Sequence, residues 1–229
     1  MEGNMGKKLS EMTNEELWKL FPIILAEHKE EWTEQYENME AFLKEKLSCW
    51  KIVRISHIGS TAIKNICAKP IIDILVEIAP KEDMNAVAAI ITENGFTKMS
   101  EDTKKMSFNH GYTENGFADK IFHLHLRFAG DNNELYFRDY FNEKSNIAKE
   151  YERLKLDLWH KFEHNRDGYS EAKTEFIEKH TMAAKYHYKN KYVYNDNCPC
   201  RKKKCVRNGN CEACRIYHAD SKRLRPCEK

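Results

Sequence analysis

Residues 52–78 read IVRISHIGSTAIKNICAKPIIDILVEI, and this stretch decides the fold. Its first part, 52–58, is rich in β-branched residues and stops at Gly59 and Ser60, which predicts a strand that runs into a turn. Its last part, 71–78, is a nearly continuous apolar run with a proline on either side, as expected of a strand buried on both faces. We therefore expect the second strand to lie in the interior of a sheet.

The chain on either side of this stretch alternates between helical and strand-like patterns. Residues 121–128 alternate strictly between apolar and polar side chains, which predicts a further strand. Apolar residues recur at helical spacing in several other segments, and Gly95 is placed to end one of them. The pattern predicts an α/β fold in which helices cover the sheet. The expected helices span about 30–47, 81–94, 132–162 and 170–188.

Polar side chains interrupt the apolar pattern on one face of each of two strands. Because successive side chains of a strand point to opposite faces, residues two apart share a face. If the two strands are neighbours, carboxylates, imidazoles and a cation meet there and could bind a divalent ion, while Arg127 and Lys69 hold an anionic group. The alternative is a hydrogen-bonded network in the core. The residues are Asp73, Leu75 and Glu77 on one strand and His123, His125 and Arg127 on the other.

Four short segments and several later residues form a recognisable pattern. The segments are His57–Ile63 (HIGSTAI), Ala68–Val76 (AKPIIDILV), His123–Leu126 (HLHL) and Phe137–Tyr140 (FRDY), followed by Tyr151, Leu154, Lys155, Tyr169, Ala172, Lys173, Phe176 and Ile177. Together they resemble the GrpB family, and they cover roughly residues 20 to 185 in family order, which makes a chance match very unlikely.

The resemblance implies a nucleotidyltransferase-like mixed β-sheet flanked by helices. That superfamily is similar in having a Gly-Ser turn after one strand and two carboxylates on the next, and Gly59, Ser60 and Asp73 match this pattern. In active members the carboxylates hold two Mg²⁺ ions that bridge the nucleotide phosphates. The resemblance thus implies Mg²⁺-dependent transfer of a nucleotidyl group from a nucleoside triphosphate to an unknown acceptor. The Gly-Ser turn feeding a helix is expected to bind phosphate.

The second acidic position departs from this pattern because Leu75 stands there. Glu77 is the candidate replacement, and His123 or His125 the candidate for a further metal ligand. Two other functions remain open: a catalytically degenerate module that binds a nucleotide or another partner, and a metal-dependent phosphohydrolase built on the two histidines and Asp73.

Two basic residues in family-like segments have two interpretations each. Arg138, in the segment FRDY, either clamps a phosphate or carboxylate or pairs with Asp139 to pin the start of a helix. Lys173 belongs either to a solvated helix face or to the mouth of the site. His57 is expected to be a packed strand histidine.

Composition bounds the class of protein. The chain has 229 residues, of which 41% are hydrophobic. Its formal net charge is only +2, which argues against a protein that binds nucleic acid or anionic membrane through its overall positive charge. No leader-like segment or long apolar run occurs, so we expect a cytoplasmic protein without a membrane partner.

We expect one domain over residues 1–190 and a Cys-rich module over 195–229, joined by a linker near 189–197. Cys49 and Cys67 are expected in the core of the first.

The Cys-rich module carries a strong metal signal. Seven thiol or imidazole ligands fall within thirty residues, and so short a segment cannot bury enough apolar surface to fold unaided. In a reducing compartment such a cluster indicates structural zinc rather than disulfides, and the ligand count leaves open one ion or two. The candidate ligands are Cys198, Cys200, Cys205, Cys211, Cys214, His218 and Cys227.

Basic residues surround these cysteines. Residues 195–229 contain ten Lys or Arg and four Asp or Glu, so the module could present a basic face to RNA or DNA. Tyr217 is its one aromatic ring from Cys198 onward, which weakens a base-stacking interpretation. Seven of the ten are singled out as surrounding the cysteines: Lys202, Lys203, Lys204, Arg207, Arg215, Arg223 and Arg225.

Overall fold

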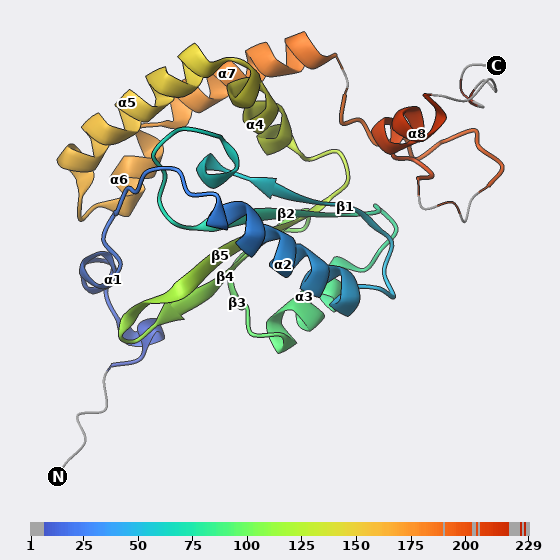
Figure 1. Ribbon diagram of the computed structural model, residues 1–229. Coiled ribbons are helices and arrows are strands. Elements are labelled where there is room, and N and C mark those ends of the chain that lie inside the picture. The colour runs from blue at the N-terminus through green and yellow to red at the C-terminus, as the bar shows by residue number, and fades with distance from the viewer. Residues whose placement is uncertain are drawn as a thin grey trace.

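A computed structural model of the chain describes residues 7–189, 191–202, 205, 207–219, 225 and 227. Within them, five strands form one central sheet in the order β1-β2-β5-β4-β3 (Figure 1). β2 and β5 run parallel and the other neighbouring pairs run antiparallel, so the expected mixed sheet is confirmed. The strands are β1 (Ile52–Ile58), β2 (Ile72–Ile78), β3 (Thr97–Glu101), β4 (Lys105–Thr113) and β5 (Gly116–Phe128).

One face of the sheet carries the apolar core. Ile74 of β2 and Leu124 of β5 are fully buried there, and Trp32 packs against the same cluster. Two amphipathic helices cover this face, α2 (Glu31–Lys46) and α3 (Met84–Glu93). Complete burial of one such aliphatic side chain contributes roughly 1.5–3 kcal/mol. This face therefore anchors the strands.

The other face of the sheet carries the polar residues and lies under the later helices. Leu75 of β2 packs there against Leu135 and Ala184. A second apolar layer around Phe137 and Tyr151 joins the helices to one another. The helices on this side are α4 (Asn133–Glu143), α5 (Ser145–Phe162), α6 (Arg166–Glu171) and α7 (Thr174–Tyr188).

The two strands that carry the polar residues are neighbours in parallel register. Asp73 pairs with His123 and Leu75 pairs with His125 across β2 and β5. Glu77 is likewise level with Arg127. The condition that the sequence left open, that these two strands are neighbours, is met, although the side chains on the shared face do not all enter one site.

Local structure departs from the sequence-based expectations at several points. Gly59 is followed by a single 3-10 turn, Ser60–Ala62, and not by a helix, so helix N-terminal amides do not form a phosphate site there. The edge strand β3 was not expected, because its residues are exposed along its whole length and show no apolar alternation. Cys49 is exposed and Cys67 is half-buried, which corrects their expected place in the core.

The segment after α7 is not a bare linker. Tyr192 is buried in the cluster around Leu75, and its backbone N–H donates to the hydroxyl of Tyr136 at 3.1 Å. Tyr194 forms an isolated bridge with Asn210, which leads into the short helix α8 (Cys211–His218). The Cys-rich segment is thus attached to the body of the protein through these residues.

At the other end of the chain, Thr13 and Glu16 form a capping box. The Thr13 hydroxyl accepts from the backbone N–H of Glu16, and the Glu16 carboxylate accepts from the N–H of Thr13. This box begins helix α1 (Asn14–Leu20), which stops before Pro22 because proline cannot continue the hydrogen-bond ladder.

None of the helices among the described residues is long and apolar enough to cross a membrane.

Candidate functional site

A hollow of about 490 Å³ opens on the polar face of the sheet, between the strands and the later helices. Strand residues form its floor and helix residues its walls, so groups far apart in the sequence meet in it. The predicted residues that line it are Gly59, Ser60, Lys69, Asp73, His123 and Lys173. Six of the residues named from the sequence therefore share one site.

Asp73 lies directly against the turn that follows β1. Gly59 has φ 71°, and a Cβ added there would stand 2.1 Å from Asp73 Oδ2. A side chain at that position would collide with the carboxylate and would also strain the backbone. Glycine therefore allows the carboxylate of β2 to reach the Gly59-Ser60 turn, which explains the sequence spacing physically.

The two histidines of β5 hold Asp73 in its ionised form. His123 Nδ1 lies 3.3 Å and His125 Nε2 3.8 Å from Asp73 Oδ1, and the Asp73 side chain is 26% exposed. Burial raises the pKa of this carboxyl group, but hydrogen bonds from His123 and His125 outweigh it and hold the pKa well below its usual range. Asp73 is therefore a fixed negative charge and a poor proton acceptor at neutral pH.

Both ring nitrogens of His123 are engaged. Nδ1 faces Asp73, and Nε2 lies 2.8 Å from the hydroxyl of Tyr112, which in turn accepts from Arg166 at 3.1 Å. An imidazole needs an unshared nitrogen lone pair to ligate a transition metal. These contacts disfavour the phosphohydrolase interpretation and give His123 the task of orienting Asp73.

Four lysines line the hollow, and three of them, on different elements, have lowered pKa values. Burial, together with the charge of Lys173, lowers the pKa of both Lys69 and Lys155 to about 7. Burial also lowers the pKa of Lys173 to about 8. Lysines carry such low pKa values when their charge lacks solvent and opposing anions. A bound polyanion would supply the missing negative charge.

Lys155 was not recognised as a site residue from the sequence. It lies on α5, four residues after Tyr151 and on the same buried face, and it is only 1% exposed. Its ammonium donates to the carbonyl of Cys67 and lies 4.8 Å from the ring of Tyr151. A lysine on the apolar stripe of an amphipathic helix was the available signal, because such a charge is rarely buried without a partner or a ligand.

Tyr169 stands between two of these lysines. The ammonium of Lys173 lies 4.1 Å and that of Lys69 5.1 Å from the centre of its ring. The ring is fully buried, and its hydroxyl has no hydrogen-bond partner within the described part of the chain. A buried hydroxyl without a partner costs free energy unless a ligand or water supplies one. Tyr169 is thus a second site residue that periodicity alone assigned to the core.

Arg127 acts beside the hollow rather than inside it. Its guanidinium pairs with Glu134 at 2.7 Å and with Asp131 at 3.2 Å, so it is not available to clamp an anion in the way expected from the sequence. Glu134 does line the hollow, and its second carboxylate oxygen is buried without a hydrogen-bond partner among the described residues. Arg127 therefore positions Glu134, another residue that the sequence did not single out.

Glu77 and Arg138 also lie outside the hollow. The fully buried Glu77 carboxylate pairs with Arg54 and accepts from Gly130 N at 2.9 Å, so it does not replace the missing second carboxylate. Arg138 pairs with Asp139 at 2.7 Å and donates to the carbonyl of His57 at 2.9 Å. Of its two interpretations the pair with Asp139 is the one observed, but in the middle of α4 and not at a helix start.

A clamp of two Mg²⁺ ions does not fit these residues. Leu75 is fully buried in an apolar cluster, and Asp73 is already held by two histidines. No group of three or more His, Cys, Asp or Glu side chains in the described part of the chain is arranged to hold a metal ion. Two-metal catalysis needs bridging carboxylate oxygens that this face does not supply.

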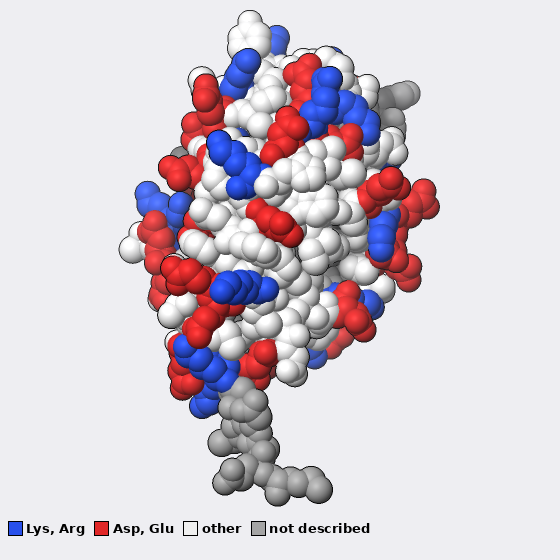
Figure 2. All heavy atoms as spheres, turned by 90° about the vertical axis from the view of Figure 1, so that its left-hand side faces the viewer, with Lys and Arg blue, Asp and Glu red and all other residues white. Residues whose placement is uncertain are grey.

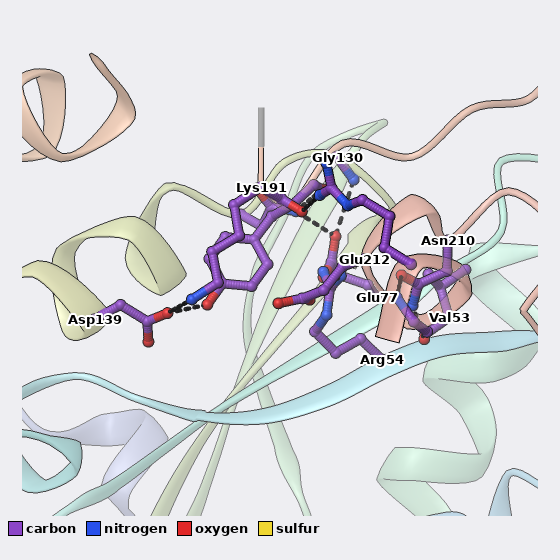
Figure 3. A network of polar contacts seen from close by, with 12 residues as sticks. Val53, Arg54, Glu77, Gly130, Asp139, Lys191, Asn210 and Glu212 are labelled. Atoms are coloured by element: carbon purple, nitrogen blue, oxygen red, sulfur yellow. Dashed lines mark hydrogen bonds and ion pairs between the residues drawn. The ribbon is translucent and has the colours of Figure 1, made fainter. Parts of the chain in front are cut away.

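A buried polar network attaches the Cys-rich module of residues 195–229, called the tail below, to the sheet (Figure 3). Arg54 of β1 pairs with Glu77 on one side and, at 3.2 Å, with Glu212 of α8 on the other. Asn132, the N-cap of α4, donates to Glu77 at 2.9 Å and to the carbonyl of Tyr192 at 3.0 Å. The network therefore joins the C-terminal end of β2, the start of α4 and the tail.

The predicted zinc ligands divide into two groups in the structure. Cys198, Cys211, Cys214 and Cys227 line one small hollow. Cys200, Cys205 and His218 lie outside its lining. None of the eight cysteines, all of which belong to the described residues, is in a disulfide.

The basic residues of the tail are only partly described. Lys203, Lys204 and Arg223 lie outside the described residues. Arg207 lies 3.6 Å from the ring centre of Tyr217, and Arg215 donates to the carbonyl of Lys191 at 2.9 Å. A nucleic-acid partner for this tail stays a prediction.

Figure 2 shows the molecule from the left-hand side of Figure 1. Acidic and basic side chains are interspersed on this face, and the largely uncharged middle region has an acidic side chain within it. Among the described residues drawn there, neither sign forms an extended patch. This face therefore lacks the basic surface that binding of a long nucleic acid would need.

Comparisons with known proteins match the body of the chain. The family model described as GrpB protein matches residues 22–183. The Glutamate-rich protein GrpB of Alkalihalophilus pseudofirmus is 33% identical over 162 residues, covering 68% of this chain and 92% of that protein. The UPF0157 protein YqkA of Bacillus subtilis is 31% identical over 185 residues, covering 80% of this chain but only 53% of that protein.

Solved structures extend the comparison to the fold. The crystal structure of the conserved protein GrpB from Enterococcus faecalis has a TM-score of 0.62 and 28% identity, covering 72% of this chain and 99% of that one. The Cid1 poly(U) polymerase is more distant, with a TM-score of 0.44 and 10% identity over 59% of this chain and 44% of that one. A similarity as low as the second assigns no activity.

Proposed function

This chain belongs to the GrpB family, and we propose that its hollow binds a nucleoside triphosphate or a related polyphosphate and supports transfer of a nucleotidyl group to an acceptor hydroxyl. One observation carries the proposal. Three lysines with lowered pKa values line the same hollow as the Gly59-Ser60 turn and as Tyr169, whose buried hydroxyl has no hydrogen-bond partner among the described residues.

The lysines are suited to neutralise phosphate charge. Burial lowers the pKa of each of Lys69, Lys155 and Lys173, so a bound polyanion would raise these pKa values again, complete the protonation of the ammonium groups and accept charge-assisted hydrogen bonds from them. The hydroxyls of Tyr169 and Ser60 would donate to the same phosphate oxygens. These groups thus take over charge neutralisation that a second metal ion would otherwise provide.

The carboxylates have a different task. Asp73 stays ionised, and Glu134 has an oxygen without a hydrogen-bond partner in the part of the chain that the structure describes, so both would accept hydrogen bonds from hydroxyls of the nucleotide or the acceptor. In the transfer, the acceptor oxygen forms a bond to the α-phosphorus, the bond to the β-phosphate bridge breaks, and pyrophosphate leaves while the hydroxyl proton passes to water. No step of this scheme needs a metal ion whose ligands are all protein side chains.

Calorimetry with ATP and with tripolyphosphate tests the binding. Lys155→Met and Lys69→Met should each weaken binding by about tenfold or more, because each removes a charge-assisted contact worth roughly 1.5–3 kcal/mol. Lys149→Met is the matched control on the same helix, since its ammonium pairs with Glu152 on the surface. Absence of any binding heat from the parent protein, or equal losses in all three variants, would contradict the proposal.

A second candidate function is binding without turnover. The burial of Leu75 among apolar side chains, in the place of a second acidic residue, favours it. In that case the tail would deliver the protein to nucleic acid or to a protein partner. Release of pyrophosphate from ATP in the presence of candidate acceptor hydroxyls distinguishes the two. Turnover that Asp73→Ala removes supports transfer, while tight nucleotide binding without turnover supports the binding module.

A further inference from the structure

The tail lacks the apolar core that folds the rest of the chain. All eight residues of α8 keep part of their surface exposed, and the Ile216 and Tyr217 side chains are 70% and 62% exposed. The tail also lies outside the residues that match the family model. A segment of this length needs a cross-link or a metal ion to hold its conformation.

Four thiols meet where such a link would act. Cys198, Cys211, Cys214 and Cys227 line a hollow of about 20 Å³, and they come from three separate segments of the tail. Cys211 and Cys214 occupy the first turn of α8, three residues apart, so both side chains lie on one face of the helix. The N-cap Asn210 fixes this turn by accepting from the N–H of Ala213 at 3.0 Å.

We propose that these four cysteines form a structural zinc site. Four thiolates are a common ligand set of tetrahedral structural zinc, in which each sulfur lies about 2.3 Å from the ion. The described residues contain no three-ligand group already arranged as a metal site, so binding must draw the sulfurs inward around the small hollow. The arrangement selects four of the seven candidate ligands and leaves Cys200, Cys205 and His218 outside.

The site would also fix the contact between the tail and the sheet. Glu212 lies between two of the four cysteines in the sequence and pairs with Arg54, which itself pairs with the buried Glu77 (Figure 3). Asn210, next to Cys211, donates to the carbonyl of Val53 at 3.2 Å. Zinc bound by the first turn of α8 would therefore fix the positions of Asn210 and Glu212, and with them the two contacts of the tail with β1.

Metal analysis of the full-length protein, purified with zinc and under reducing conditions, tests the site. We expect about one zinc ion per chain. The variants Cys198→Ser, Cys211→Ser, Cys214→Ser and Cys227→Ser should each lose most of it. Cys205→Ser in the tail and Cys49→Ser on the body are matched controls and should keep it. A metal-free parent protein, or a Cys205→Ser variant that loses as much zinc as Cys211→Ser, would overturn the proposal.

Hydrogen exchange provides a readout that does not depend on purified zinc content. Chelation of the ion should expose the amides of 211–218 at least tenfold faster while those of β2 stay protected. Unchanged exchange in α8 after complete chelation, or disulfides among the four cysteines in intact-mass measurements of the native protein, would contradict a zinc site. The polyphosphate hollow involves none of these cysteines, so this proposal and the proposed function fail independently.

Discussion

The body of the protein and its Cys-rich tail are held by different kinds of contact. In the body, Ile72, Ile74 and Val76 are fully buried, and the strands are covered by helices on both faces. In the tail, α8 buries no complete side chain and is attached through Glu212 and Asn210. The body can therefore keep its fold when a polar contact is lost, whereas the tail depends on a few such contacts and on its thiols.

The difference also shows which region can accommodate site residues that lower its stability, and this region is the body. The body buries three lysines with lowered pKa values and the Tyr169 hydroxyl, which has no hydrogen-bond partner among the residues that the structure describes. The tail buries too little apolar surface to offset the cost of such buried polar groups. Four substitutions or conditions test this contrast, beginning with the one expected to have the largest effect.

Leu75→Asp should be the most damaging change in the body. It places a carboxylate in an apolar cluster that offers it no partner, and we expect a loss of about 4 kcal/mol or more in the free energy of unfolding. Leu75→Met conserves volume and should cost less than about 1.5 kcal/mol. Urea titration measures both, and a stable Leu75→Asp protein that gains Mg²⁺ affinity would show that the cluster can house a second metal ligand.

Arg54→Met should affect both regions. It leaves the carboxylate of Glu77 buried without its cation and also removes the partner of Glu212, so we expect a loss of roughly 3–5 kcal/mol in the free energy of unfolding. Arg153→Met, at an exposed position of α5, is the control and should change it by less than about 0.5 kcal/mol. Equal stability of the two variants would mean that the network does not bind the tail to the sheet.

Raising the pH should weaken polyphosphate binding. In the free protein, lysines with a pKa of about 7 to 8 lose their protons as the pH rises through this range, while a polyanion binds their protonated forms. Binding then takes up protons, and the affinity should fall by about tenfold or more between roughly pH 6.5 and pH 9. Calorimetry in buffers of different ionisation enthalpy measures the proton uptake, and Lys155→Met should reduce it. A pH-independent affinity would contradict the assigned role of the lysines.

Glu212→Gln should have the smallest effect. The Glu212 side chain is 21% exposed, so its pair with Arg54 is worth no more than about 1 kcal/mol. We expect faster hydrogen exchange in α8 and an unchanged melting temperature of the body. Glu171→Gln, at an exposed position at the end of α6, serves as the control. Loss of body stability in the Glu212 variant would show that the two regions are more tightly coupled than their contacts indicate.

The sequence predicted the parts of the fold that follow from periodicity. The bounds of β1 agree with the expected strand, and the alternation of β5 places His123 and His125 on one face as expected, whereas the register of these residues with Asp73 was left open by the sequence. It did not predict β3, whose residues are exposed and carry no pattern, or the exposure of Cys49.

Only part of the site could be predicted from the sequence, because contacts between segments distant in the chain determine which side chains reach the hollow. The Gly59-Ser60 turn and Asp73 could be found from their spacing, since glycine lets the two approach. Glu77 shares a strand face with Asp73 but is taken by Arg54, which no local pattern reveals. Lys155 and Tyr169 reach the hollow from helices distant in the sequence, and periodicity assigns such positions to the core.

The central claim is that the three lysines bind phosphate, and the ionisation of Lys155 tests it most directly. Nuclear magnetic resonance of the full-length protein with isotope-labelled lysine, assigned with Lys155→Arg, reports its pKa. The account predicts a pKa of about 7 without ligand and a rise toward the ordinary lysine value of 10.5 when tripolyphosphate is added. A pKa that stays the same at saturating tripolyphosphate would contradict it.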